Sequence, residues 1–337
     1  MKKIIAILMV SLMILSLFTF ASCTKEETAG DDTTNDTATT LKLGLGVYTK
    51  VSATDATEDK AGQGQATHTV AAVLVDDNGK IVKAFIDCAD NKVGYTADGK
   101  AVANESFKTK YEAGADYNMV AYGGAAKEWF EQADAFCALI VGKTAAEVKA
   151  LVVDGDKGTD DVINAGCTIT VAEFALAVEK AINNATASNA TKNDTLKLGV
   201  STAQTTTDAT EDKAGSNKVE TTFFAAAVNA EGKVVAASSD CVEVSFTFDL
   251  TGKSTFDATK EVLTKKEKGD SYNMVAYGGA TKEWYAQAAA FDAACIGKTV
   301  AEIKSIEGAD GKGNADLQAA GCTIAISGFV KAVSKIG

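Results

Sequence analysis

The chain contains an internal repeat, and this duplication limits its fold more than any other feature. The sequence Tyr-Asn-Met-Val-Ala-Tyr-Gly-Gly-Ala at residues 117–125 recurs unchanged at 272–280. Two shorter blocks recur with the same spacing: Thr-Leu-Lys-Leu-Gly at 40–44 and 195–199, and Gly-Lys-Thr at 142–144 and 297–299. A chain of 337 residues also suits two domains better than one. The repeat therefore predicts two tandem copies of one domain.

The composition of the intervening segments sets the expected boundaries. The segment between the copies is a run of Asn, Ala, Thr and Ser, which is typical of a short flexible linker. The segment after the first apolar run is rich in Thr, Asp, Glu and Ala and cannot bury enough apolar surface to fold. The predicted parts are a signal peptide at 1–22, a disordered acidic tether at 23–39, a first repeat domain at 40–183, a linker at 184–194 and a second repeat domain at 195–337.

The N-terminus is typical of an export signal with a lipid attachment site. Lys2 and Lys3 precede an apolar run at 4–20 that is too short and too weakly flanked for a stable membrane span. Small residues then stand directly before Cys23, an arrangement that resembles the bacterial lipobox, in which the cysteine thiol receives a diacylglycerol. This predicts a lipoprotein held by Cys23 in the lipid bilayer, on the extracytoplasmic face of the cell membrane. The alternative is an ordinary secretory signal in which Cys23 has no role.

The charge of the chain excludes some partners. Its formal net charge is −12, which disfavours nucleic acid and anionic lipid headgroups. The chain has no arginine, so no guanidinium can bind a phosphate or carboxylate in a bidentate manner. Lysines, hydroxyls and backbone amides are left to hold any phosphate.

Hydrophobic periodicity predicts an α+β fold in each copy. Apolar runs at 70–75 and 81–86 flank an Asn-Gly turn, which predicts a β-hairpin. Apolar residues from 129 to 141 recur at helical spacing, so a helix with one buried face is expected there. Three further elements are predicted in the first copy: a short helix at 145–151 capped by Thr144, a strand at 167–171 and an amphipathic helix at 172–182. Each copy is thus expected to be a small antiparallel sheet with three or four helices.

The cysteines and the single histidine favour structural roles over catalysis. Cys88 and Cys241 end equivalent strands, Cys167 and Cys322 begin equivalent strands, and Cys137 and Cys295 lie on the buried stripe of the helix. These six form no Cys-x-x-Cys pair, so core packing is expected, with a disulfide inside each domain as the alternative. His68 has no counterpart in the second copy and lies in a polar stretch. We expect it to be a solvated loop residue, which argues against a catalytic triad or a histidine metal site.

Two repeated blocks suggest function. Thr-Asp-Ala-Thr-Glu-Asp-Lys-Ala-Gly at 54–62 recurs at 207–215, and its polar composition predicts an exposed loop presented to a second protein. The second block runs from Tyr117 to Trp129 and recurs from Tyr272 to Trp284. It can form a ligand site, because its tyrosines and methionine offer surface for stacking, its glycines allow close approach of a ligand, and its lysine at a helix N-terminus can hold a phosphate. The alternative is a helix entry loop packed on its own domain. The candidate ligand residues are Tyr117, Met119, Gly123, Gly124, Lys127, Trp129, Tyr272, Met274, Gly278, Gly279, Lys282 and Trp284.

The order of these blocks resembles the PplA-like extracellular flavoproteins of Gram-positive bacteria, and the resemblance covers nearly the whole mature chain. It rests on the lipobox, the acidic tether, the two Asp-Ala-Thr loops, the Lys-Glu-Trp helix starts and the Gly-Lys-Thr turns. The resemblance implies FMN bound covalently to threonine by a separate FMN transferase. It also implies electron relay from a membrane quinol or NADH dehydrogenase to an external acceptor, so that the chain is an electron carrier and not an enzyme.

The same resemblance indicates which threonines carry the flavin. Its transfer motif ends in Ala-Thr with a hydroxyl residue two positions before the alanine, which fits Thr57 and Thr210. Thr281 also follows an alanine and is the alternative; its partner in the first copy is Ala126. Two other classes stay open: a lipid-anchored protein that binds a small ligand, and a structural surface protein without flavin.

Overall fold

The computed structural model describes residues 39–104 and 106–337, which belong to one compact unit. The predicted signal peptide, Cys23 and the tether up to residue 38 lie outside these described residues. The first repeat contains β1 (Lys42–Thr54), β2 (Gly62–Val75), β3 (Ile81–Tyr95), β4 (Ala101–Val102), α1 (Lys110–Ala113), the 3-10 helix η1 (Gly114–Tyr117), α2 (Trp129–Ile140), α3 (Ala145–Lys149), α4 (Asp160–Ala165) and α5 (Ala172–Asn183).

The second repeat follows the same order after a two-residue strand, β5 (Thr186–Ala187). Its elements are β6 (Thr195–Thr207), β7 (Gly215–Val228), β8 (Val234–Phe248), α6 (Lys265–Lys268), η2 (Gly269–Tyr272), α7 (Trp284–Cys295), α8 (Val300–Lys304), α9 (Ala315–Ala319) and α10 (Ser327–Val333). The strands form two antiparallel sheets, in the orders β4-β3-β2-β1-β5 and β6-β7-β8. The predicted α+β fold with an antiparallel sheet in each copy is confirmed.

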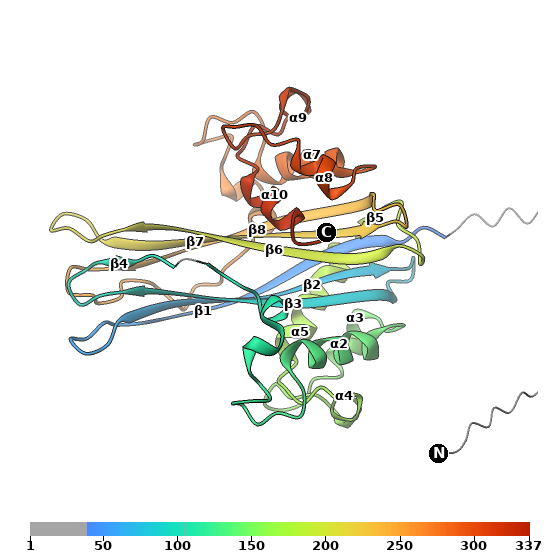
Figure 1. Cartoon of the computed structure of the whole chain (residues 1–337), viewed down its shortest axis with the longest axis horizontal. Coiled ribbons are helices and arrows are strands. Elements are labelled where there is room, and N and C mark those ends of the chain that lie inside the picture. Colours follow the sequence, from blue (N-terminus) through green and yellow to red (C-terminus); the bar gives the residue numbers. More distant parts are fainter. Residues whose placement is uncertain (1–38, 105) are drawn as a thin grey trace, which may run out of the picture. The chain divides into compact units, whose positions relative to one another are not determined.

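The helices of each repeat cover the outer face of that repeat's sheet, and the inner faces of the two sheets pack against each other (Figure 1). The central strand β2 shows why its sequence is an unbroken apolar run. Side chains alternate along a strand, so Val70, Ala72 and Leu74 enter the core between the sheets, while Ala71 and Val73 pack beneath the helices. Because both faces are covered, neither can be polar.

Glycines in the first strand of each sheet allow the last helix to approach closely. A Cβ on Gly46 would lie 2.2 Å from the carbonyl oxygen of Ala177 in α5, and one on Gly199 would lie 2.0 Å from that of Ala332 in α10. No side chain fits in this space, so the helix backbone rests directly on the strand. This contact fixes α5 and α10 over the sheets and, with them, one wall of each candidate site.

His68 is buried, and its prediction as a solvated loop residue is wrong. It belongs to β2 and faces the second sheet, where its ring packs against Phe223 with 5.8 Å between the ring centroids. Its Nδ1 lies 2.9 Å from the Thr49 hydroxyl oxygen. Burial lowers the pKa of His68 to about 3, so the ring is neutral. The polar stretch around it is strand: the Gln65 and Thr67 side chains donate to Asp90 on β3, and the Thr69 hydroxyl donates to Glu173 on α5. Among the described residues the Nε2 of His68 has no hydrogen-bond partner.

Two further local predictions differ from the structure. Residues 167–171 are not a strand: the backbone N–H of Thr168 donates to the Gln132 side chain at 2.8 Å, so a side chain takes the place of a neighbouring strand. The segment predicted as a flexible linker is an ordered connection. Its β5 pairs with β1, and Leu41 N donates to the carbonyl of the fully buried Ala190 at 2.7 Å. Hydrogen bonds thus order a segment whose composition alone suggested flexibility.

Candidate functional site

The repeated segments at 117–129 and 272–284, here called the aromatic blocks, each form a loop that is held by a carboxylate side chain. We call this loop the braced loop. Glu128, at the start of α2, accepts hydrogen bonds from the backbone N–H groups of Met119 and Val120 at 2.9 and 3.3 Å. Asn118 adopts a left-handed conformation with φ of 62°, which turns the chain into this loop. In the second repeat, Glu283 holds Met274 and Val275 in the same way. The carboxylate therefore fixes the loop against the helix that follows it.

Each braced loop forms one wall of a pocket. In repeat 1, Tyr117, Met119 and Trp129 meet around a cavity of about 180 Å³. In repeat 2, Tyr272, Met274 and Trp284 meet around a cavity of about 290 Å³. The structure thus brings three predicted ligand residues of each repeat together, at equivalent places. The repeat-2 cavity is close to the lower size limit of small-molecule sites.

A lysine lies in each pocket, buried in the case of Lys265 and half-buried in that of Lys110, and the sequence reasoning missed both. Lys110 and Lys265 each begin a one-turn helix after a capping threonine, Thr109 or Thr264. A strand aspartate ties each helix to the sheet: Asp87 accepts from the N–H of Tyr111, and Asp240 from that of Lys266, both at 3.1 Å. Burial raises the pKa of both Asp87 and Asp240 to about 6. The repeated Thr-Lys pair at 109–110 and 264–265 is the signal that could have revealed these lysines.

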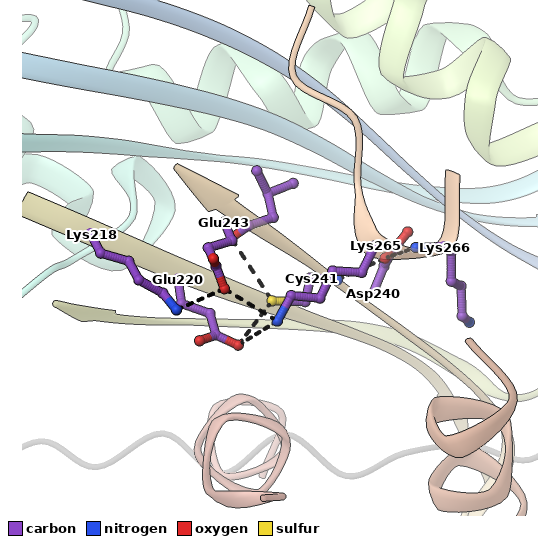
Figure 2. Close-up of polar contacts among 8 residues, drawn as sticks. Lys218, Glu220, Asp240, Cys241, Glu243, Lys265 and Lys266 are labelled. Carbon is purple, nitrogen blue, oxygen red and sulfur yellow. Dashed lines mark hydrogen bonds and ion pairs between the residues drawn. The ribbon is translucent and has the colours of Figure 1, made fainter. Parts of the chain in front are cut away.

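The lysine of repeat 2 lies among carboxylates, as Figure 2 shows. Its Nζ is 2.8 Å from Glu220 and 3.7 Å from Glu243, and lies 5.3 Å from the ring centre of Tyr272. Burial by itself lowers the pKa of Lys265, but the Cys241 thiol and the Glu220 carboxylate raise it above its ordinary value. Lys265 is therefore a permanent positive charge at the floor of the pocket.

The thiol beside it is not reactive. Cys241 Sγ lies 3.4 Å from a Glu220 oxygen, and burial raises the pKa of this thiol. All six cysteines of the described chain are free and buried, which agrees with core packing. The described residues contain no cluster of histidine, cysteine and acidic residues that could hold a metal ion.

The predicted lysines and glycines of the aromatic blocks lie away from the pockets. Lys282 Nζ donates to the carbonyl of Ala320 at 3.0 Å, and Lys127 Nζ lies against Gly166 at the end of α4. The structure therefore does not bring these lysines to the pocket as phosphate ligands. Four glycines, Gly123, Gly124, Gly278 and Gly279, shape the loop, and Gly124 and Gly279 take positive φ values of 68° and 65°.

The candidate attachment threonines lie in two different settings. Thr57 and Thr210 are exposed at the tips of the β1–β2 and β6–β7 hairpins, where their N–H groups donate to Lys60 and Lys213 at 2.8 Å. In repeat 1 Gly62 and the pocket residue Thr69 are seven residues apart on β2, or about 23 Å at the usual rise; in repeat 2 Gly215 and the pocket residue Glu220 are five residues apart on β7, or about 17 Å. Thr281 is exposed and directly follows Ala280, whose N–H donates to the carbonyl of the pocket residue Met274 at 3.1 Å. Of the three, Thr281 lies nearest one of the two matched pockets, whereas Thr57 lines a separate hollow at the hairpin tip.

The Asp-Ala-Thr tips also hold the two repeats together. Ala56 N donates to the carbonyl of Gly252, and Ala209 N donates to that of Gly99, both at 2.8 Å. Asp55 accepts from the N–H of Ser254 at 2.8 Å; reciprocally, Asp208 accepts from that of Ala101 at 2.9 Å. At the centre of this reciprocal contact, the rings of Tyr95 and Phe248 stack with 4.5 Å between their centroids. We call this set of contacts the clasp. It explains why much of the block is retained in both copies.

Comparison with protein-family models, with curated proteins and with solved structures found no match. Within the described residues, none of the helices has the length and apolar character needed to cross a bilayer. The geometry of the chain itself therefore carries the functional argument.

Proposed function

We propose that this chain is a lipid-anchored extracytoplasmic carrier of covalently bound FMN that relays electrons from a membrane quinol or NADH dehydrogenase to an external acceptor. The supporting observation is that all three candidate threonines present exposed side chains on loops whose neighbouring backbone is held by hydrogen bonds. An FMN transferase can reach such a hydroxyl without unfolding the chain. Attachment needs an activated donor, a flavin dinucleotide: the threonine Oγ attacks the phosphorus of its FMN half, the pyrophosphate bond breaks, the nucleoside monophosphate leaves, and the hydroxyl proton passes to a base of the transferase.

The surroundings of Thr281 suit this role best. A flavin on Thr57 or Thr210 stands at a hairpin tip, whereas one on Thr281 lies beside the repeat-2 pocket. FMN, when bound, supplies one- and two-electron transfer. The chain supplies aromatic walls from Tyr272 and Trp284, and the Lys265 ammonium places a positive charge where negative charge would accumulate on reduction.

Intact-mass spectrometry tests the proposal. A chain that begins at Thr24, and so lacks the predicted export signal and Cys23, is exported by another route together with an FMN transferase. Thr57→Ala, Thr210→Ala and Thr281→Ala variants are prepared in parallel. We expect one or more added FMN masses, each lost with one substitution, and visible flavin absorbance. No added mass in the unsubstituted chain would exclude covalent flavinylation.

A second candidate function, reversible binding of a small ligand without flavin, is favoured by the pockets themselves. The repeat-2 cavity is lined by aromatic, hydroxyl and charged groups and needs no covalent attachment to hold a ligand. The two functions differ in a simple observation. A flavin carrier made with the transferase retains its yellow colour after denaturation and gel filtration, whereas a reversible binder loses its ligand.

A further inference from the structure

The floors of the two pockets are built from the same side chains. Each contains a threonine and a cysteine from neighbouring strands and the lysine of the one-turn helix. A tyrosine and a methionine come from the braced loop, and a tryptophan and a phenylalanine come from two helices. The matched pairs are Thr69 and Thr222, Cys88 and Cys241, Lys110 and Lys265, Tyr117 and Tyr272, Met119 and Met274, Trp129 and Trp284, and Phe174 and Phe329.

The rims are different, and four of the differences make the repeat-2 pocket wider. Tyr48 pairs across the sheet with Thr69, and Ser201 pairs with Thr222, so the two rims can be matched position by position. On this register, four larger side chains of repeat 1 are replaced by smaller ones in repeat 2: Tyr48 by Ser201, Lys50 by Ala203, Thr170 by Ala325 and Glu173 by Gly328. The four positions lie on a strand, a loop and a helix, and they surround one cavity.

In repeat 1 these larger side chains narrow the rim. Glu173 accepts a hydrogen bond from the Thr69 hydroxyl at 3.0 Å and forms an ion pair with Lys50 at 2.5 Å. In repeat 2 Ala203 and Gly328 cannot form this pair, and the cavity is about 290 Å³ against 180 Å³ in repeat 1. A Cβ on Gly328 would lie 2.7 Å from the Thr222 hydroxyl oxygen, so the helix backbone itself lies close to the strand at this point. Loss of the ion pair and the hydrogen bond removes local interactions from the empty protein. The replacement of four larger side chains around one cavity is expected where a ligand takes part of that space.

The lining of the open pocket indicates the class of ligand. Tyr272, Trp284 and Phe329 give flat apolar walls, and Ser201 and Thr222 add hydroxyl groups. Lys265 lies at the floor and Lys331 at the rim, so the charged lining groups, with Glu220, sum to a positive charge in an acidic protein. These features suit a planar ring with hydrogen-bond acceptors and a negative charge.

We propose that the repeat-2 pocket alone seats such a ring, and that the repeat-1 pocket is closed by the Lys50–Glu173 pair. This inference rests on the proposed function, in which the ring is the flavin. The threonine beside the pocket follows the same asymmetry, because Thr281 of repeat 2 corresponds to Ala126 of repeat 1.

Titration with free FMN tests the inference without a transferase. The chain that begins at Thr24 is made without the enzyme, and quenching of FMN fluorescence is measured. We expect one equivalent to bind. The closing variant Ala203→Lys/Gly328→Glu, which copies the rim of repeat 1, should weaken binding at least tenfold. The opening variant Lys50→Ala/Glu173→Gly should add a second equivalent. The control Lys149→Ala/Glu179→Ala removes a surface ion pair that lines neither pocket and should change nothing.

Each other outcome overturns the inference. Two equivalents in the unsubstituted chain would show that repeat 1 is open, and unchanged affinity in a folded closing variant would place the ligand elsewhere. If the closing variant does not fold, Lys331→Glu at the rim replaces it, with a threefold or greater loss of affinity expected. Absence of FMN binding contradicts the inference even when covalent FMN is found by mass. Conversely, binding of free FMN without covalent attachment would support the pocket and reject the proposed function.

Discussion

Repeat 1 and repeat 2 have the same fold but keep their buried polar groups in different places. In repeat 1 the pocket carboxylate is Glu173 on α5, and it pairs with Lys50 at the rim. In repeat 2 the carboxylates come from strands, where Glu220 and Glu243 surround Lys265 at the floor. The comparison shows that the apolar and glycine framework determines the fold. The polar set can change when each buried charge finds a partner.

The largest expected effect concerns the interface position where repeat 1 has His68 and repeat 2 has Thr221. The folded-state pKa of His68 is about 3, well below the ordinary value of about 6.5. The neutral ring therefore contributes stability above pH 6.5, and this contribution is lost as the pH falls toward 3. We expect a loss on the order of 4 kcal/mol over that range. His68→Thr, which copies repeat 2, should remove this part of the pH dependence.

The measurement is the free energy of unfolding by urea at several pH values. Asp87 and Asp240 act in the opposite sense, because burial raises their pKa to about 6 and stability from them is lost as the pH rises toward that value. The difference between the unsubstituted chain and His68→Thr cancels their contribution. Equal slopes for both proteins between pH 6.5 and 3 would contradict the buried, neutral histidine.

The second prediction breaks the clasp that joins the repeats. A Cβ on Gly252 would lie 2.5 Å from the carbonyl oxygen of Thr96 and 2.7 Å from the side chain of Ala56. Gly252→Ala should therefore lower the free energy of unfolding by about 3 kcal/mol, as the sum of contact and backbone strain. Gly79→Ala is the matched control: Gly79 has a similar positive φ but no atom near its added Cβ. It should cost only about 1 kcal/mol. Similar losses in both variants would mean that the clasp carries little stability.

The third prediction compares the two pocket lysines. Lys265→Met leaves Glu220 without its ion-pair partner, although Glu243 keeps Lys218 at 2.9 Å, while Lys110 forms no ion pair among the described residues. Because Glu220 is 40% exposed, solvent screens part of the effect, and we expect a loss of about 2 kcal/mol, with a smaller loss for Lys110→Met. Adding Glu220→Thr, the residue equivalent to Thr67 of repeat 1, should restore part of the stability. Thermal unfolding at neutral pH measures the series, and an equal loss from both lysines would show that the carboxylates do not matter.

The sequence predicts local structure well where a segment shows one clear hydrophobic period, that of a strand or that of a helix. The β2–β3 hairpin, the helix from Trp129 and the Thr144 cap are confirmed, because their signals lie within a few neighbouring residues. The contact between the two sheets cannot be seen in such signals, because it joins residues far apart in the chain. For that reason His68 is mistaken for a loop residue. The retention of Asp55 and Ala56 is likewise attributed to presentation, although both contact the other repeat.

The candidate site is predictable in part for the same reason. Tyr117, Met119 and Trp129 lie within one repeated block, and the structure places them around one pocket. Lys110 comes from a separate helix and Cys88 from a strand, so only the fold brings them to the block. The size of the pocket depends on rim residues from β1 and α5, which no local pattern connects.

The clasp joins two halves whose sequences can diverge independently. Its contacts are reciprocal, as in a dimer with twofold symmetry, where every contact is made twice by identical subunits. In such a dimer one gene encodes both halves, so any substitution that opens one pocket opens the other. Here both halves lie on a single polypeptide, and each position can vary alone. Tandem fusion thus allows one half to specialise while the other continues to serve as its scaffold.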